Sequence, residues 1–255
     1  MSSNISATSK IKPVQKKRTI SMQTSIAYFI LSLVINSAGN VLTLVTSAKI
    51  HPSYLGAAYW TAATANFGAA LNWNLFWAFI IIGILTVILN AILIGHWSWS
   101  RAIGNMIFMV PFSALIQVFA DFFNGVYPVY KGLPEAHSLG MIILYILLNF
   151  FGVALIAIAI SIYQRVNLVL HPADDLMQVL RFKYFKGHAA AAMWVSYIPP
   201  TVLAIIALII DHQFTNLGLG TIFAFLFQGG ITGFADKRIF PNLHHQALDV
   251  GKQIS

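Results

Sequence analysis

The sequence predicts an all-α membrane protein with about six transmembrane helices in two inverted three-helix repeats. Hydrophobic residues make up 58% of the 255 residues and charged residues only 9%. Long uncharged stretches follow one another, with basic residues at their alternate ends. A soluble domain carries about 25% charged residues, so this composition indicates contact with lipid. The apolar stretches are continuous, which favours helices over the alternating strands of a barrel.

The first half, residues 24–123, is expected to form the first membrane repeat. Its expected spans cover 24–47, 73–95 and 103–123, each near the roughly 20 residues that a crossing helix needs. The stretch 52–71 between them is also uncharged and rich in small residues. A full crossing by this stretch would invert every later loop and weaken the charge bias, so we expect it to be re-entrant, broken or surface-lying.

The second repeat, residues 139–236, follows a polar central loop at 124–138. Three spans are expected in it: 139–163, 189–210 and 217–235. Pro199 and Pro200 are expected to kink the middle one. The segment 172–186 mixes acidic, basic and apolar residues, which predicts an amphipathic helix lying at the membrane interface.

The placement of charge orients the chain in the membrane. A cluster of basic residues at 10–18 precedes the first span and has no apolar signal core before it, so the tail 1–23 is expected to be cytoplasmic. Alternation then places Arg101, the segment 165–186 and the tail 237–255 on the same side. The central loop is therefore extracellular, and we expect a multi-pass plasma membrane protein with both ends in the cytoplasm.

Three short patterns recur in the same order in both halves. His51-Pro52 and His171-Pro172 are each expected to open a short helix. The hexapeptide at 103–108 matches 219–223, and a Phe-Ala-Asp triplet occurs at 119–121 and again at 234–236. Three crossings per half would make the second half inverted, a plan that recurs among transporters with the solute site near the midplane.

Polar residues within the spans are the candidate solute contacts, because burying them in hydrocarbon is costly. The predicted solute pathway comprises Asn36, Asn40, Asn105, Gln117, Asp121, Asn149 and Gln228. Asn36 and Asn40 share one helix face, as do Gln117 and Asp121. The alternative is that these amides only bond neighbouring helices, which contributes about 0.6 kcal/mol each on average, and that Asp121 ends its helix among headgroups.

The helix starts and the basic residues suggest two further contacts. A helix that begins at Pro52 or Pro172 inside the membrane would offer free N–H groups and the positive dipole end to an anionic group. In the alternative interpretation His51 and His171 only cap a turn. Three basic side chains in the amphipathic segment are expected to meet anionic lipid headgroups: Arg181, Lys183 and Lys186.

The composition also argues against several functions. The sequence has no cysteine, which excludes disulfides and thiolate chemistry. It lacks an HExxH motif, a histidine cluster, a recognisable nucleophile and paired interior carboxylates, so we expect neither a metal, a cofactor nor an enzyme. The sequence has no basic face with interleaved aromatic residues, the pattern that would indicate nucleic-acid binding. The net charge of +8 is therefore assigned to cytoplasmic loops.

Several segments resemble the YitT/YczE family of bacterial integral membrane proteins. The resemblance lies in Ala38-Gly39-Asn40, in 171–177, in 217–222 and in Gly229-Gly230, and it covers roughly 27–241. The residues before the two His-Pro pairs depart from the family pattern, in which small residues and Gly precede the Pro. The resemblance implies a bacterial plasma membrane protein, and because some members are labelled sugar-specific permeases, it implies sugar as one possible solute.

The leading hypothesis from the sequence is a small transporter or permease for a small polar or amphipathic solute. Its expected partners are the lipid bilayer, the solute and a coupling cation, without nucleic acid. Two alternatives stay open: a non-transporting accessory protein that docks through 172–186, and a channel, because paired short helices in inverted repeats also occur in pores. The sequence does not predict the oligomeric state.

Overall fold

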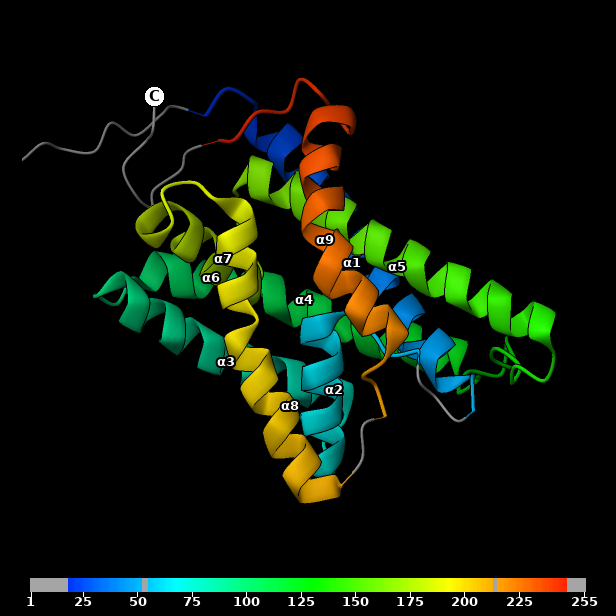
Figure 1. Cartoon of the computed structure of the whole chain (residues 1–255). Helices are drawn as coiled ribbons and strands as arrows, with labels where there is room; N and C mark the ends of the chain where they lie inside the picture. The colour runs from blue at the N-terminus through cyan, green and yellow to red at the C-terminus, as the bar shows by residue number, and fades with distance from the viewer. Residues whose placement is uncertain (1–17, 52–54, 213–214, 247–255) are drawn as a thin grey trace, which may run out of the picture.

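The computed structural model describes residues 18–51, 55–212 and 215–246, and the regular structure in these ranges is helical (Figure 1). The helices are, in chain order, α1 Met22–Ala48, α2 Tyr59–Ala70, α3 Leu75–Ile94, α4 Trp99–Phe123, α5 Leu139–Val166, α6 Pro172–Val179, the π-helix η1 Leu180–Tyr184, α7 Ala189–Ser196, α8 Ile198–Asp211 and α9 Leu219–Arg238. The predicted all-α class is confirmed for the described residues.

Five helical stretches of the described chain are long and apolar enough to cross a membrane: α1, α3, α4, α5 and Ala191–Asp211, which joins most of α7 to α8. Large apolar side chains such as Ile92, Leu147 and Ile209 point outward from them, which is compatible with lipid contact. The expected sixth span forms α9, a 20-residue helix. It is not among the five, because its many Gly and Thr residues and its charged end lower its hydropathy.

The two short helices begin differently. α6 starts at Pro172 as predicted, and Nδ1 of His171 accepts the N–H of Ala173 at 3.1 Å. α2 starts at Tyr59, so the prediction that the His51 pair opens this helix is wrong, and Pro52 itself lies outside the described residues. With 12 and 8 residues respectively, α2 and α6 are too short to cross a bilayer, which takes roughly 20 residues.

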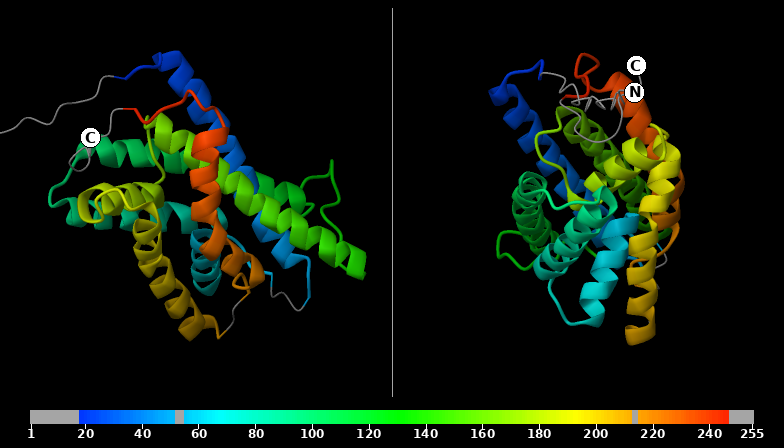
Figure 2. Two further views of the ribbon diagram at one scale, coloured as in Figure 1. Left: turned by 45° about the horizontal axis from the view of Figure 1, so that its top comes forward. Right: turned by 90° about the vertical axis from the view of Figure 1, so that its left-hand side faces the viewer.

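The centre of the bundle is the antiparallel crossing of α1 and α5 (Figures 1 and 2). Gly39 and Gly152 face each other there. A Cβ on Gly39 would lie 2.7 Å from the Gly152 carbonyl oxygen, and a Cβ on Gly152 would lie 2.8 Å from that of Gly39. Small residues let the two backbones approach this closely, and Asn149 Nδ2 donates to the Thr43 carbonyl at 3.0 Å beside them.

The two halves of the chain, α1–α4 and α5–α9, are interleaved through their short helices. In the first half α4 packs on α1, and in the second half α9 packs on α5. α2 packs along α8, with the Tyr59 hydroxyl 2.6 Å from Thr201 Oγ1, while α6 packs against α3. Each short helix therefore rests on a longer helix of the other half (Figure 1).

The prediction of an interfacial helix over 172–186 is wrong for its first part. All residues of α6 except Asp174 are buried, and the helix lies against α3, α4 and α7. Its polar side chains find partners within the protein, because Arg101 Nη2 lies 2.7 Å from Asp175 Oδ1. The amphipathic pattern arises from this internal pairing, which sequence periodicity does not distinguish from contact with headgroups.

Candidate functional site

A cavity of about 60 Å³ lies in the middle of the bundle, with room for a few water molecules. Its polar lining consists of Asn36, Asn40, Thr61, Thr64, Thr86, Tyr163, His171, Asp174, Tyr197 and Gln228. The remaining wall is largely aromatic or aliphatic and includes Tyr59, Trp60, Phe79, Ile82 and Phe112. A mostly apolar wall with a few convergent polar groups is typical of a site for a small molecule.

Both short helices begin at this cavity. The segments 58–61 at the start of α2 and 171–174 at the start of α6 contribute to its wall. Thr61 and Asp174 each occupy the third position of their helix and lie 113 residues apart in the sequence. Because the first turn of a helix carries the positive end of its dipole, both first turns direct this positive end toward the same space. In α6 the N–H groups are already bonded, that of Ala173 to His171 Nδ1 and those of Asp174 and Asp175 to the His171 carbonyl.

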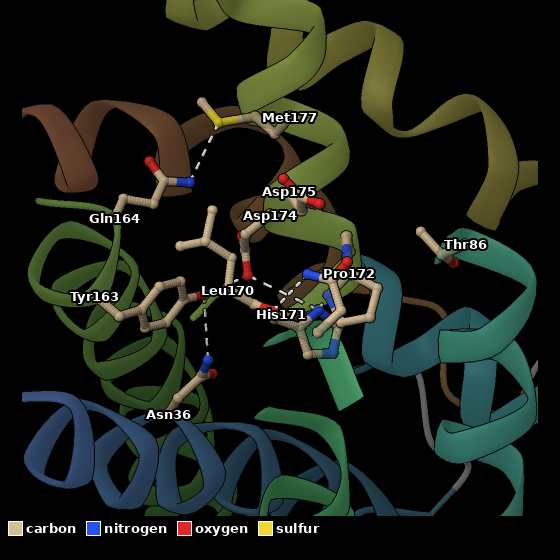
Figure 3. A network of polar contacts seen from close by, with 12 residues as sticks. Asn36, Thr86, Tyr163, Gln164, Leu170, His171, Pro172, Asp174, Asp175 and Met177 are labelled. Atoms are coloured by element: carbon tan, nitrogen blue, oxygen red, sulfur yellow. Dashed lines mark hydrogen bonds and ion pairs between the residues drawn. The ribbon is translucent and has the colours of Figure 1, made fainter. Parts of the chain in front are cut away.

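A series of hydrogen bonds, here called the polar relay, connects the two short helices through α1 and α5. Thr61 Oγ1 donates to Asn40 Oδ1, and Asn40 Nδ2 donates to Asn36 Oδ1 at 2.7 Å. Asn36 Nδ2 in turn donates to the Tyr163 hydroxyl at 3.4 Å, and that hydroxyl donates to Asp174 Oδ2 (Figure 3). Every donor points toward Asp174, so the relay polarises in one direction and ends on a carboxylate.

Asp174 has a hydroxyl beside it and no compensating cation among the described residues. Nδ1 of His171 lies 3.8 Å from Asp174 Oδ2, but it accepts the Ala173 N–H and therefore carries no proton. Burial lowers the pKa of His171 to about 3, so the ring is neutral. Burial likewise raises the pKa of Asp174, which lies outside the five candidate spans, to about 7; the Tyr163 hydrogen bond lowers this pKa and nearby Asp175 raises it.

Asp175 has the opposite environment. Arg101 Nε lies 2.8 and 2.9 Å from its two carboxylate oxygens, and Arg101 Nη2 lies 2.7 Å from one of them. Asn90 Nδ2 donates to the Pro172 carbonyl at 2.9 Å and lies 3.5 Å from Asp175 Oδ2. This buried, bidentate pair fixes α6 to α3 and α4, and Asp175 does not line the cavity.

The structure brings four of the predicted site residues to the cavity: Asn36, Asn40, His171 and Gln228. Asn105 and Asn149 lie elsewhere and donate to backbone carbonyls, Asn105 to Leu170 and Asn149 to Gly56, each at 2.8 Å. They have the interhelical role that was the alternative prediction. Gln117 and Asp121 also lie outside the cavity, where Gln117 Nε2 donates to Asp121 Oδ1 at 2.8 Å.

The remaining predicted residues lie away from the cavity. His51 is exposed and its Nε2 is 3.1 Å from Glu135. Lys183 Nζ donates to the Leu93 and Ile94 carbonyls at 2.8 and 2.6 Å, so it caps the end of α3. Arg181 Nε donates to the Gly187 carbonyl at 3.0 Å, and Lys186 is exposed. Contact of Arg181, Lys183 and Lys186 with lipid headgroups stays a prediction.

Sequence reasoning missed Thr61, Tyr163 and Asp174. The sequence places Asp174 only within the amphipathic segment 172–186, and Tyr163 only at the end of the span 139–163. Aligning the halves on the Gly39–Gly152 spacing of 113 residues would have placed Asp174 opposite Thr61. No local pattern marks Tyr163, because its role depends on how α5 crosses α1.

The described residues define a class: a helical protein with five candidate membrane-spanning helices around a central cavity that has a few convergent polar groups. The chain belongs to DUF6198, a family of unknown function whose profile matches residues 23–237. This range runs from the second residue of α1 to the next-to-last residue of α9, so the match includes every element of the cavity. No curated protein and no solved structure matches the chain.

Proposed function

We propose that this protein is a small transporter that moves a small polar solute across a cell membrane through the central cavity. In this proposal α9 is a sixth crossing, and α2 and α6 are re-entrant helices that enter from opposite faces. The observation that carries it is the central cavity where the first turns of both short helices meet the α1–α5 crossing. Paired broken helices at a midplane site are a recurring feature of transporters.

Reciprocal contacts support an inverted repeat. Asn105, near the start of α4, donates to the Leu170 carbonyl at 2.8 Å, and Thr221, near the start of α9, donates to the Ala57 carbonyl at 2.7 Å. Each acceptor lies two residues before the first residue of a short helix. The same contact thus occurs twice, once in each direction between the halves, as a two-fold relation between repeats requires.

The charges support an orientation. If the N-terminal basic cluster is cytoplasmic, α1 runs outward and the antiparallel α5 runs inward. The loop after α3, the first turn of α4 with Arg101, and the basic segment after α5 then lie on the cytoplasmic side. The linker to α2 enters from outside and the linker to α6 from inside, so the cavity lies near the middle of the membrane.

The lining supports a neutral, hydroxyl- or amide-bearing solute. Asn40 and Gln228 provide amides, and Thr64 and Tyr197 provide hydroxyls. The rings of Tyr59 and Trp60 provide flat surfaces of the kind on which a small polyol or sugar packs. The accessory-protein alternative has less support, because most of the helix proposed to dock a partner is buried.

Cysteine accessibility tests the proposal without knowledge of the solute, since the natural chain has no cysteine. Thr64→Cys lines the cavity, Ser113→Cys is equally buried outside it, and Lys131→Cys is exposed. In proteoliposomes a membrane-impermeant thiol reagent should modify Thr64→Cys from both faces as the halves rock, and should leave Ser113→Cys unmodified. An inert Thr64→Cys beside a reactive Lys131→Cys would contradict a solute pathway.

A flux assay then examines the solute class. Shrinking and swelling of proteoliposomes in glycerol, urea and xylitol should be faster than in protein-free vesicles for at least one solute. Asn40→Leu, which removes amide contacts, should slow this flux by about tenfold, the effect of losing about 1.4 kcal/mol of binding. Gln117→Leu lies outside the cavity and should not change it. Equal loss in both variants would argue against the cavity as the pathway.

A further inference from the structure

We propose that Asp174 binds the proton that drives solute movement, so that solute and proton cross together. The inference rests on the proposed transport function and assigns its coupling ion. It starts from geometry: among the described residues, Asp174 is the one carboxylate that lines the central cavity, and it accepts the last hydrogen bond of the polar relay.

The groups around Asp174 leave its charge uncompensated. From α5 it faces the Tyr163 hydroxyl, and from its own segment it faces the unprotonated Nδ1 of His171. Asp175, the next residue, is already paired with Arg101. Tyr197 from the α7–α8 junction also lines the cavity and is neutral at ordinary pH. Asp174 is partly buried, with 18% of its side chain exposed. A carboxylate that is partly removed from water and has no cation beside it is destabilised, and a proton is the simplest means of neutralising it.

The first turn of α6 limits this cost without removing it. The Asp174 N–H bonds the His171 carbonyl at 3.0 Å, so the carboxylate lies at the positive end of the helix dipole, where an anion is favoured. Burial disfavours the same anion. Burial is the main cause that raises the pKa of Asp174, to about 7, and the Tyr163 hydrogen bond opposes it, so both protonation states are populated at neutral pH.

The relay explains how the proton and the solute are linked. When Asp174 is ionised, it accepts the Tyr163 hydroxyl, and the relay behind it is fixed in one direction. When Asp174 takes up a proton from water, its O–H becomes a donor, and the Tyr163 hydroxyl is released to donate to a solute. Solute binding is therefore favoured with the proton bound. Deprotonation on the other side restores the Tyr163 bond and expels the solute.

The equivalent position of α2 cannot carry a charge. Thr61 stands there, and its hydroxyl donates to Asn40 at the opposite end of the relay. The site therefore takes up one proton for each solute. The polar relay also has a direction, because each hydrogen-bond donor in it points away from α2 and toward α6.

Infrared spectroscopy of the full-length protein in lipid nanodiscs tests proton binding directly. The chain has only seven acidic side chains, so the carbonyl band of a protonated carboxyl can be assigned by substitution. We expect a band that is present at pH 6, fades with a midpoint near 7 and is absent from Asp174→Asn. The exposed Asp211→Asn should keep it. A band that survives in Asp174→Asn, or no titration near neutral pH, would overturn the inference.

Thr64→Cys links the proton to the motion. Between one pH unit below and one above its pKa, the protonated fraction of a carboxyl falls from about 90% to about 10%. Because the thiolate is the reactive form of cysteine, the labelling rate of Thr64→Cys is divided by that of the exposed Lys131→Cys at the same pH. This ratio should change by several-fold over the range, and in Thr64→Cys combined with Asp174→Asn it should be independent of pH. Thr64→Cys combined with Asp174→Glu, which again has a carboxyl group at this position, should show the pH dependence. A purely structural role of Asp174 would not predict this recovery.

The two proposals fail in different ways. If Thr64→Cys is labelled from both faces but the infrared band is absent, transport stands and the coupling proton is wrong. If the band titrates but Thr64→Cys is inert, Asp174 binds a proton in a protein that does not open a pathway, and both the transport function and the coupling that rests on it are refuted.

Discussion

The short helices α2 and α6 both begin at the central cavity but are held by different interactions. α2 is positioned by neutral contacts, because the carbonyls of Gly56 and Ala57 accept hydrogen bonds from Asn149 and Thr221. α6 is positioned by the buried pair of Asp175 and Arg101. The comparison teaches that two short helices can reach one cavity through different chemistry, and that the one carboxylate among the lining residues, Asp174, comes from α6.

The first turns of α2 and α6 also differ in how they are held. α2 has Ala58 at its N-cap position with no side-chain hydrogen bond, whereas His171 caps α6. The ring of His171 also packs edge-on against Phe108 and Phe112, with centroids 5.5 and 5.0 Å away. α6 is thus the more firmly specified of the two, which suits a helix that must hold a titratable group in a fixed place.

The largest effect is expected from breaking the α6 anchor. Arg101→Ala leaves Asp175 buried without its cation, and removing one partner of a buried pair costs about 3–5 kcal/mol. Arg238→Ala, at the exposed end of α9, should cost little. Thermal unfolding in detergent, followed by circular dichroism, measures both. Because Arg101→Ala combined with Asp175→Ala leaves no unpaired charge, it should be more stable than Arg101→Ala alone, and a double variant that is less stable would contradict this account of α6.

A smaller effect is expected from the contact that holds the α2 linker. A Cβ added to Gly220 would overlap Asn149 Oδ1, which itself lies beside the α2 linker, and would lie 2.8 Å from the carbonyl oxygens of both Leu55 and Gly56. Gly220→Val should therefore cost about 1–3 kcal/mol through overpacking. A Cβ at Gly230 on the same helix would have no atom within 4 Å, so Gly230→Val is the matched control. Thermal unfolding in detergent, followed by circular dichroism, measures both variants. Equal loss of stability in the two variants would mean that helix propensity, not the α2 linker, determines the cost.

The contrast between the halves also explains what the sequence could predict. Hydropathy and charge are properties of local stretches, so the apolar spans and the short α2 and α6 could be predicted from them. The cavity depends on which helices cross: Asn36 and Asn149 have similar surroundings in the sequence, yet only Asn36 reaches the cavity. Asp174 and Asp175 are adjacent, and only the position of Arg101 on another helix separates a structural charge from a candidate functional one. Pairing across long separations carries no local signal, which is why Tyr163 was missed.

The smallest effect on stability is expected from Glu135, which lies beside His51, the predicted counterpart of His171. His51 lies on the surface beside Glu135, whose carboxylate is 3.0 Å from Lys49 Nζ and 3.1 Å from His51 Nε2. The Lys49 hydrogen bond is the main cause that lowers the pKa of Glu135 below 4.5. The Lys49–Glu135 pair therefore stabilises the fold at pH values above the pKa of Glu135 in the unfolded chain. This contribution is lost as the pH falls through the lower pKa that Glu135 has in the folded chain.

Glu135→Gln should lower stability at pH 7 by less than about 1 kcal/mol, because the pair is partly exposed and screened by solvent. The difference from the natural protein should vanish at the acid end of the titration, where Glu135 is protonated in both folded and unfolded chains. Thermal unfolding of the two proteins at a series of pH values from 7 downward measures this. A difference that instead grows toward acid, where Glu135 is uncharged, would mean that the charge of Glu135 is not the source of its contribution to stability.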